Sequence, residues 1–94
     1  MSGDVEHEIE RQRFVARHPE GTGELVYRRT AAGAIDLVHT GVDPRLRRRG
    51  IGESLIRAAL AYARANRLRV IPTCPFIARW LEKHPGERDV VASH

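Results

Sequence analysis

The hydrophobic pattern of this chain changes from the period of a strand to that of a helix between residues 40 and 51, and this change limits the folds that the chain can adopt. Residues 34–40 fit the two-residue period of a strand, with apolar Ile35 and Leu37 on one face and polar Asp36 and Thr40 on the other. From Ile51 onward the apolar residues follow helical spacing, which is typical of an amphipathic helix. Glycines and arginines fill the loop between the two patterns. The chain is therefore predicted to pass from a sheet into a helix at this loop.

Three strands are predicted before the loop and one after the helix. Residues 11–17, 24–28 and 34–40 have strand composition, and turn-forming residues at 18–23 and 30–33 separate them. Alternation places Ile35, Leu37 and His39 on one face of the third strand. The helix that begins at Ile51 is expected to end near Asn66, and residues 68–73 are expected to form a short buried strand.

A second helix is expected to begin at Pro75, because proline suits the first turn of a helix, and to stop before Pro85. The predicted order is β-β-β-α-β-α. A helix that joins two strands of one sheet makes them parallel, so we predict the α/β (α+β) fold class, with a mixed sheet and helices packed on it. We expect a flexible N-terminal tail over residues 1–10, one domain over residues 11–90 and a short tail over residues 91–94.

Length and composition exclude several classes of protein. At 94 residues the chain suits one domain, and 41% hydrophobic with 30% charged residues is typical of a folded soluble protein. No apolar run approaches the roughly 20 residues of a membrane span, and the acidic N-terminus does not resemble a secretory signal. The single cysteine, Cys74, excludes an internal disulfide and a zinc site built from several cysteines. We therefore expect a cytoplasmic protein with no membrane partner and no bound metal.

Positive charge dominates the chain and is concentrated in one place. The chain has 16 basic and 12 acidic residues, for a formal charge of +4, and Lys83 is the only lysine. This balance indicates an acidic partner, such as nucleic acid or a phosphorylated small molecule, although an arginine-rich genome would also explain the count. The clustering is more informative, because four arginines fall within five positions: Arg45, Arg47, Arg48 and Arg49.

The loop that carries these arginines also contains Gly50 and Gly52, directly before the predicted helix. A helix N-terminus has unpaired N–H groups and a positive dipole end, so it can hold an anion, and glycines let the backbone approach a phosphate. The alternative is a glycine-rich turn with solvated arginines. Neither a P-loop motif nor the three-glycine dinucleotide fingerprint is present. The loop is thus a candidate phosphate site of another kind.

Several ordered motifs resemble the GNAT superfamily of N-acetyltransferases. Residues 47–52 (RRRGIG) are similar to the family's Q/R-x-x-G-x-G/A motif, whose backbone amides bind the pyrophosphate of acetyl-CoA. Residues 36–40 (DLVHT), 70–76 (VIPTCPF) and 80–85 (WLEKHP) resemble a minimal single-domain subfamily of this length, the YjdJ type. The resemblance covers about residues 12–90 and implies a GNAT-like acyl-CoA acyltransferase fold.

The resemblance also implies acetyl-CoA as cosubstrate and an amine as acceptor. Backbone groups near Val42 would pair with the pantetheine arm, and Cys74 would lie near the acetyl thioester. The residues expected at the CoA site are Val42, Arg47, Arg48, Arg49, Gly50, Ile51, Gly52, Glu53, Cys74 and Phe76. The chain lacks the extra helices and strands that shape the acceptor site of larger members, so the acceptor, a small molecule or a protein, is left open. It also lacks the downstream tyrosine with which many larger members protonate the leaving thiolate.

Cys74 and His39 are the candidate catalytic residues. Acetyl transfer needs a deprotonated amine, a stabilised oxyanion and a proton for the leaving thiolate. Cys74 could form an acetyl-cysteine, could donate a proton, or could be a small buried thiol that lines the pantetheine channel. His39 could act as a base, directly or through water, or be a core residue. His84 is expected to end the last helix, and Phe76 and Trp80, at helical spacing, to belong to the core.

Three functions follow from these observations. The first is an N-acetyltransferase that uses acetyl-CoA, acting as a monomer or weak dimer. The second is a domain that binds CoA without turnover and acts as a sensor or partner. The third is an arginine-rich nucleic-acid-binding module, which the sequence favours least because it has few aromatic residues and no recognised RNA- or DNA-reading motif.

Overall fold

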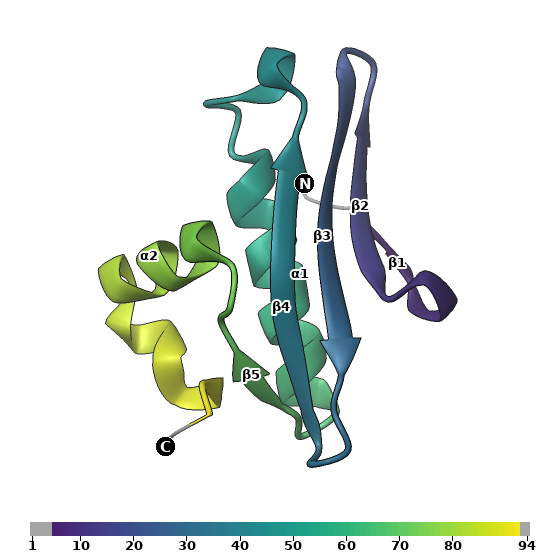
Figure 1. Ribbon diagram of the computed structural model, residues 1–94. Coiled ribbons are helices and arrows are strands. Elements are labelled where there is room, and N and C mark those ends of the chain that lie inside the picture. The colour runs from purple at the N-terminus through teal and green to yellow at the C-terminus, as the bar shows by residue number, and fades with distance from the viewer. Residues whose placement is uncertain (1–4, 93–94) are drawn as a thin grey trace.

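Five strands form one mixed sheet in the order β1-β2-β3-β4-β5 in the computed structural model, which describes residues 5–92 (Figure 1). The pairs β1-β2, β2-β3 and β3-β4 are antiparallel, and the pair β4-β5 is parallel. The strands are β1 (Val5–Glu8), β2 (Arg13–His18), β3 (Gly21–Arg29), β4 (Ala34–Val42) and β5 (Arg69–Ile71). The helices are α1 (Ile51–Ala65) and α2 (Pro75–Lys83). The predicted fold class and the parallel pair joined through a helix are confirmed.

One strand more than predicted lies at the N-terminal edge of the sheet. Residues 5–10 were expected to belong to a flexible tail, but β1 pairs with β2, with Val5 opposite Ala16 and Glu8 opposite Arg13. The acidic residues that suggest a tail are cross-strand partners here, because Glu8 accepts a hydrogen bond from Arg13 at 2.6 Å. His7, on the other face, stacks on Phe14 with 4.1 Å between ring centroids. Residues 1–4 lie outside the described part of the chain.

Helix α1 covers one face of the sheet, as the ribbon shows (Figure 1). It begins at Ile51 and ends at Ala65, with Asn66 as its C-cap, as the sequence predicts. The residues it buries are Leu55, Ile56, Ala59, Leu60 and Ala63. They pack in one core with Leu25, Tyr27, Ile35 and Leu37 of the sheet. Each such large apolar side chain contributes roughly 1.5–3 kcal/mol by leaving water. No helix in residues 5–92 is both long and apolar enough to cross a bilayer.

Helix α2 and the C-terminal segment pack beside β5. The helix begins at Pro75 and its C-cap is His84, so its predicted limits are confirmed. The following 3-10 helix (Pro85–Val90) is tied to α1 by Arg64, which donates to Asp89 at 2.7 Å and to Glu87 at 2.8 Å. Val91, expected in the C-terminal tail, instead forms a β-bridge with Val70. Residues 93–94 lie outside the described part of the chain.

A β-bulge in β4 changes which of its residues face the core. Tyr27 of β3 pairs with Leu37, but the preceding Val26 pairs with His39, so Val38 is an extra residue on β4. One extra residue moves every later side chain to the opposite face. Leu37 is fully buried, whereas His39 is exposed and Thr40 contacts the core residue Cys74. The expectation that His39 shares the face of Leu37 is therefore wrong.

Candidate active site

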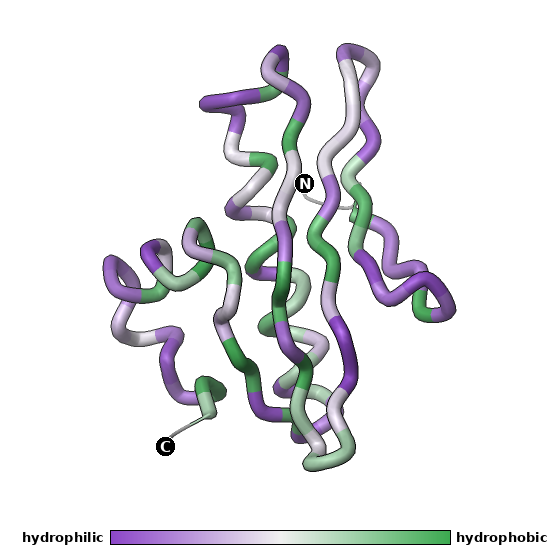
Figure 2. Tube along the Cα trace, in the orientation of Figure 1, coloured by the Kyte–Doolittle hydropathy of each residue, from purple (hydrophilic) through white to green (hydrophobic). Residues whose placement is uncertain are grey.

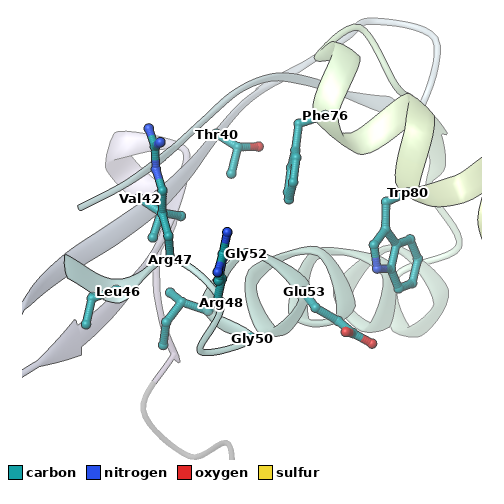
Figure 3. A pocket seen from close by; sticks show the side chains of 11 residues that line it. Thr40, Val42, Leu46, Arg47, Arg48, Gly50, Gly52, Glu53, Phe76 and Trp80 are labelled. Carbon is teal, nitrogen blue, oxygen red and sulfur yellow. The ribbon is translucent and has the colours of Figure 1, made fainter. Parts of the chain in front are cut away.

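Strands β4 and β5 diverge, and a cavity opens beyond the point of divergence. β5 pairs only with Ala34, Ile35 and Asp36, while β4 continues to Val42. The upper half of β4 faces α2 and the start of α1 instead (Figure 1). The cavity there has a volume of about 560 Å³. The residues that line it are Thr40, Val42, Leu46, Arg47, Arg48, Gly50, Ile51, Gly52, Glu53, Phe76 and Trp80 (Figure 3).

The loop before α1 forms one wall of this cavity, and its polar residues appear as a hydrophilic segment in Figure 2. A short 3-10 helix (Pro44–Leu46) is capped by Asp43, which accepts from the Arg45 N–H at 2.9 Å, and buried Leu46 anchors it. Gly50, the N-cap of α1, has φ +75°, a left-handed conformation that favours glycine. The first helical hydrogen bond runs from the Ser54 N–H to the Gly50 carbonyl. The N–H groups of residues 51–53 therefore have no partner within the helix.

Only two of the four clustered arginines line the cavity. Arg47 and Arg48 do so, and neither forms an ion pair with another described residue. Arg49 instead pairs with Glu20 at 2.9 Å. Two unpaired guanidinium groups beside a helix N-terminus make this end of the cavity electropositive. Arrangements of this kind bind phosphate groups.

Two aromatic residues of α2 line the opposite side of the cavity. Phe76, which was expected in the core, has 49% of its surface exposed, because its ring projects over the first turn of α1 (Figure 3). Trp80 is buried, and its ring contacts the side chains of Arg57 and His84. The Arg57 guanidinium is 5.1 Å from its ring centroid, and the His84 ring stacks on it at 3.9 Å. Trp80 is thus both the core residue that was predicted and a wall of the cavity.

Cys74 does not line the cavity itself but contacts Thr40, which does. Its backbone N–H donates to the Leu37 carbonyl at 2.9 Å, which holds the N-cap of α2 against β4. Its Sγ lies 3.5 Å from the Thr40 hydroxyl oxygen, and the thiol is almost fully buried. Burial would raise the pKa of the Cys74 thiol. Hydrogen bonds from the Thr40 hydroxyl and from the backbone of Ile77 and Phe76 outweigh burial, so the pKa is lowered.

His39 lies apart from this thiol. Its side chain is exposed on the face of the sheet opposite α1 and lies beside Gly41. Within the described residues no hydrogen bond joins His39 to Cys74. The structure therefore does not bring the two candidate catalytic residues into direct contact.

Eight of the ten residues expected at a CoA site line the cavity; Arg49 and Cys74 do not. That these ten residues contact CoA stays a prediction. Sequence reasoning missed Thr40, Leu46 and Trp80. Trp80 follows Phe76 by one helical turn, a signal that could have placed both on one wall. Within residues 5–92 no group of three His, Cys, Asp or Glu side chains is arranged to hold a metal ion.

The chain belongs to the GCN5-related N-acetyltransferase family, because residues 13–90 match the model of that family. Protein NATD1 of Bos taurus is 33% identical over 85 residues, which cover 86% of this chain and 74% of that protein. NATD1 of Gallus gallus is 32% identical over 86% of this chain and 76% of its own length. The solution structure of a GCN5-like protein from Staphylococcus aureus has a TM-score of 0.76 at 28% identity, and the match covers 96% of this chain and 88% of that one. The predicted family is confirmed, and the YjdJ-type subfamily stays a prediction.

Proposed function

We propose that this protein transfers an acetyl group from acetyl-CoA to the nitrogen of an amine. The observation that carries the proposal is the cavity of this family member, where the α1 N-terminus, Arg47 and Arg48 line one side and apolar residues the other. Acetyl-CoA has a pyrophosphate joined to a long uncharged arm. The charged and apolar parts of the cavity match these two halves in kind.

The residues of the loop fit a pyrophosphate. The N–H groups of residues 51–53 have no helical acceptor, so they can donate to phosphate oxygens. A β-carbon added to Gly50 would meet no atom within 4 Å, so space for a ligand lies directly over the backbone. Arg47 and Arg48 would add charge-assisted hydrogen bonds.

The upper half of β4 fits the uncharged arm. β5 stops pairing with β4 at Asp36, and no strand in residues 5–92 pairs with this edge beyond it. The backbone groups of β4 that face the cavity between Thr40 and Val42 are therefore free to bond the amides of a pantetheine arm. Phe76 and Trp80 would pack against its methylene groups.

In the proposed reaction the Cys74 thiolate attacks the thioester carbonyl carbon. A bond forms between Sγ and that carbon, the bond from the carbon to the CoA sulfur breaks, and the departing CoA thiolate takes a proton from water. A neutral amine then attacks the acetyl-cysteine. The new C–N bond forms as the C–Sγ bond breaks, the Cys74 thiolate is restored, and the surplus amine proton passes to a base. We propose His39 as that base, acting through water because it lies on the face of the sheet opposite α1 and does not contact Cys74.

The cytoplasm is the compartment that we propose, because Cys74 is a free thiol in a protein with no second cysteine. The acceptor amine belongs to a small molecule or to a peptide, and turnover of a panel of both kinds of amine distinguishes them.

Intact-mass spectrometry tests the proposal. Incubation with acetyl-CoA and no amine should add one acetyl group to Cys74, and hydroxylamine should remove it. Cys74→Ala should lose the adduct and the turnover of a panel of amines, yet still bind CoA in calorimetry. Full turnover in Cys74→Ala without an adduct in the natural protein would instead support direct attack by the amine.

A thermal scan separates the other two functions. CoA should raise the melting temperature, because a ligand at a hundredfold excess over its dissociation constant stabilises the native state by about 2.7 kcal/mol. Stabilisation by CoA with neither adduct nor turnover would favour a CoA-binding sensor. Stabilisation by oligonucleotides and not by CoA would contradict the proposal and favour the nucleic-acid-binding module.

A further inference from the structure

We propose that Thr40 is the positioning residue of the acyl-transfer site, and that its hydroxyl, at the wall of the cavity, orients the adjacent Cys74 sulfur. The inference rests on the proposed function, because it assigns a partner to the thiol that would accept the acetyl group. Thr40 lines the cavity, and its side chain lies within hydrogen-bond distance of the sulfur, with 3.5 Å between Oγ1 and Sγ.

The β-bulge at Val38 creates this contact. Without the extra residue, the alternation of β4 would place His39 on the side of Leu37 and turn Thr40 to the opposite face. With it, Thr40 faces the start of α2, and in Figure 3 its hydroxyl points toward the side from which Phe76 projects. The bulge thus replaces an imidazole by a hydroxyl beside the thiol.

The direction of the hydrogen bond follows from the charge of the sulfur. A thiolate has no proton, so the Thr40 hydroxyl must donate whenever Cys74 is ionised. Backbone groups of Phe76 and Ile77 at the start of α2, and of Thr40 itself, also lower the pKa of the thiol. Donors from two elements, β4 and α2, therefore converge on Sγ. Such convergence favours the thiolate form and restricts the orientation of its sulfur lone pairs.

Three variants test this role. Thr40→Val keeps the shape of the side chain and removes the donor, and Thr40→Ser keeps the donor. Thr73→Val is the matched control, because the Thr73 hydroxyl is adjacent to Cys74 in sequence but donates to Asp36 instead. The thiol pKa is measured from the absorbance of the thiolate at pH values from 5 to 10 (about 240 nm), after subtracting the same titration of Cys74→Ala.

Thr40→Val should raise the pKa of the Cys74 thiol by about one unit, since hydrogen bonds to charged groups are the strong ones. Thr40→Ser and Thr73→Val should leave this pKa within a few tenths of a unit of the natural protein, as judged against about one unit for Thr40→Val. The rate of acetyl-cysteine formation should fall in Thr40→Val.

An unchanged pKa in Thr40→Val, or an equal rise in Thr73→Val, would overturn the positioning role. These measurements need neither CoA nor turnover, so they separate the two proposals. A raised pKa in Thr40→Val, with no acetyl adduct in the natural protein, would uphold the contact and reject Cys74 as the acyl carrier. A normal adduct with an unaffected pKa would reject the contact alone.

Discussion

The ring of Phe76 lies against Gly52, so closely that a β-carbon on Gly52 would be 3.0 Å from two of its ring atoms. The contact joins the first turn of α1 to the first turn of α2 across the cavity (Figure 3). Because Phe76 is half exposed, its ring is free to move toward solvent or toward the cavity when Gly52 gains a side chain. A side chain at position 52 is therefore expected to change the shape of the cavity more than the stability of the helix.

Gly52→Ala should fold with nearly unchanged melting temperature, because alanine is the better helix former and offsets the displaced ring. CoA binding, measured by calorimetry, should weaken by about tenfold or more, which corresponds to roughly 1.4 kcal/mol. The double variant Gly52→Ala/Phe76→Ala removes the displaced ring and should regain part of the affinity. An unaltered dissociation constant in Gly52→Ala would show that this contact does not shape the CoA site.

Gly50 is expected to behave differently, because its constraint is the backbone angle. Its φ of +75° disfavours branched side chains, while a β-carbon there would meet no atom within 4 Å. Gly50→Val should lose about 1–2 kcal/mol of the free energy of unfolding in urea and should lose CoA binding. Gly50→Asn, which tolerates a left-handed angle, should keep most of the stability. If both variants bind CoA as the natural protein does, phosphate does not sit over this residue.

The parts of the fold that local sequence determines were predictable. Helix α1 begins at Ile51 because the glycine-arginine loop ends there, and its apolar stripe is complete within one segment. Helix α2 begins at Pro75 and ends before Pro85 for similarly local reasons. Seven of the eight expected residues that line the cavity lie within residues 42–53, because the end of β4, the loop and the first turn of α1 are consecutive in the chain, and the eighth, Phe76, belongs to α2.

The parts that depend on distant residues were not predictable. β1 is acidic and resembles a tail in the sequence, but Glu8 lies opposite Arg13 on β2 and Glu6 forms an ion pair with Arg17. The bulge at Val38 was not predicted, because valine has strand propensity and an unbroken two-residue period can be drawn through residues 34–40. This one residue decides that Thr40, and not His39, lies beside the thiol. The catalytic candidates were thus the least predictable part of the site.

His39 gives a prediction about the second half of the proposed reaction. If it is the base for the amine, His39→Ala should lower amine turnover by about a hundredfold. Formation of acetyl-Cys74 should be unaffected, since that step needs no proton from the amine. The exposed position of His39 predicts an unchanged melting temperature. His18→Ala, at the end of β2, is the matched control and should turn over normally. Equal turnover in both variants would leave a water molecule as the proton acceptor.

His7 makes the stability of the fold depend on pH. Its ring stacks on Phe14, lies edge-on to Tyr62 at 4.4 Å and hydrogen-bonds the Tyr27 hydroxyl at 2.5 Å. Burial lowers the pKa of His7 below its ordinary value of 6.5. The unfolded chain therefore binds a proton at a higher pH than the folded chain does. The free energy of unfolding should fall as the pH drops from about 6.5 toward the folded pKa of His7.

Urea unfolding of the natural protein and of His7→Phe measures this dependence. It is carried out at about pH 7.5 and about pH 5.5, which lie on either side of the ordinary histidine pKa. Phenylalanine keeps an aromatic ring against Phe14 but does not titrate, so the loss of stability between the two pH values should be smaller in the variant. All other ionisable groups are common to the two proteins, so the comparison isolates the contribution of His7. Hydrogen bonds from arginines lower the pKa of Glu8, Glu87 and Asp89. Their stabilisation is present above the ordinary carboxyl pKa and is lost only at more acid pH. Identical losses in the two proteins would mean that His7 is as easily protonated in the folded chain as in the unfolded one.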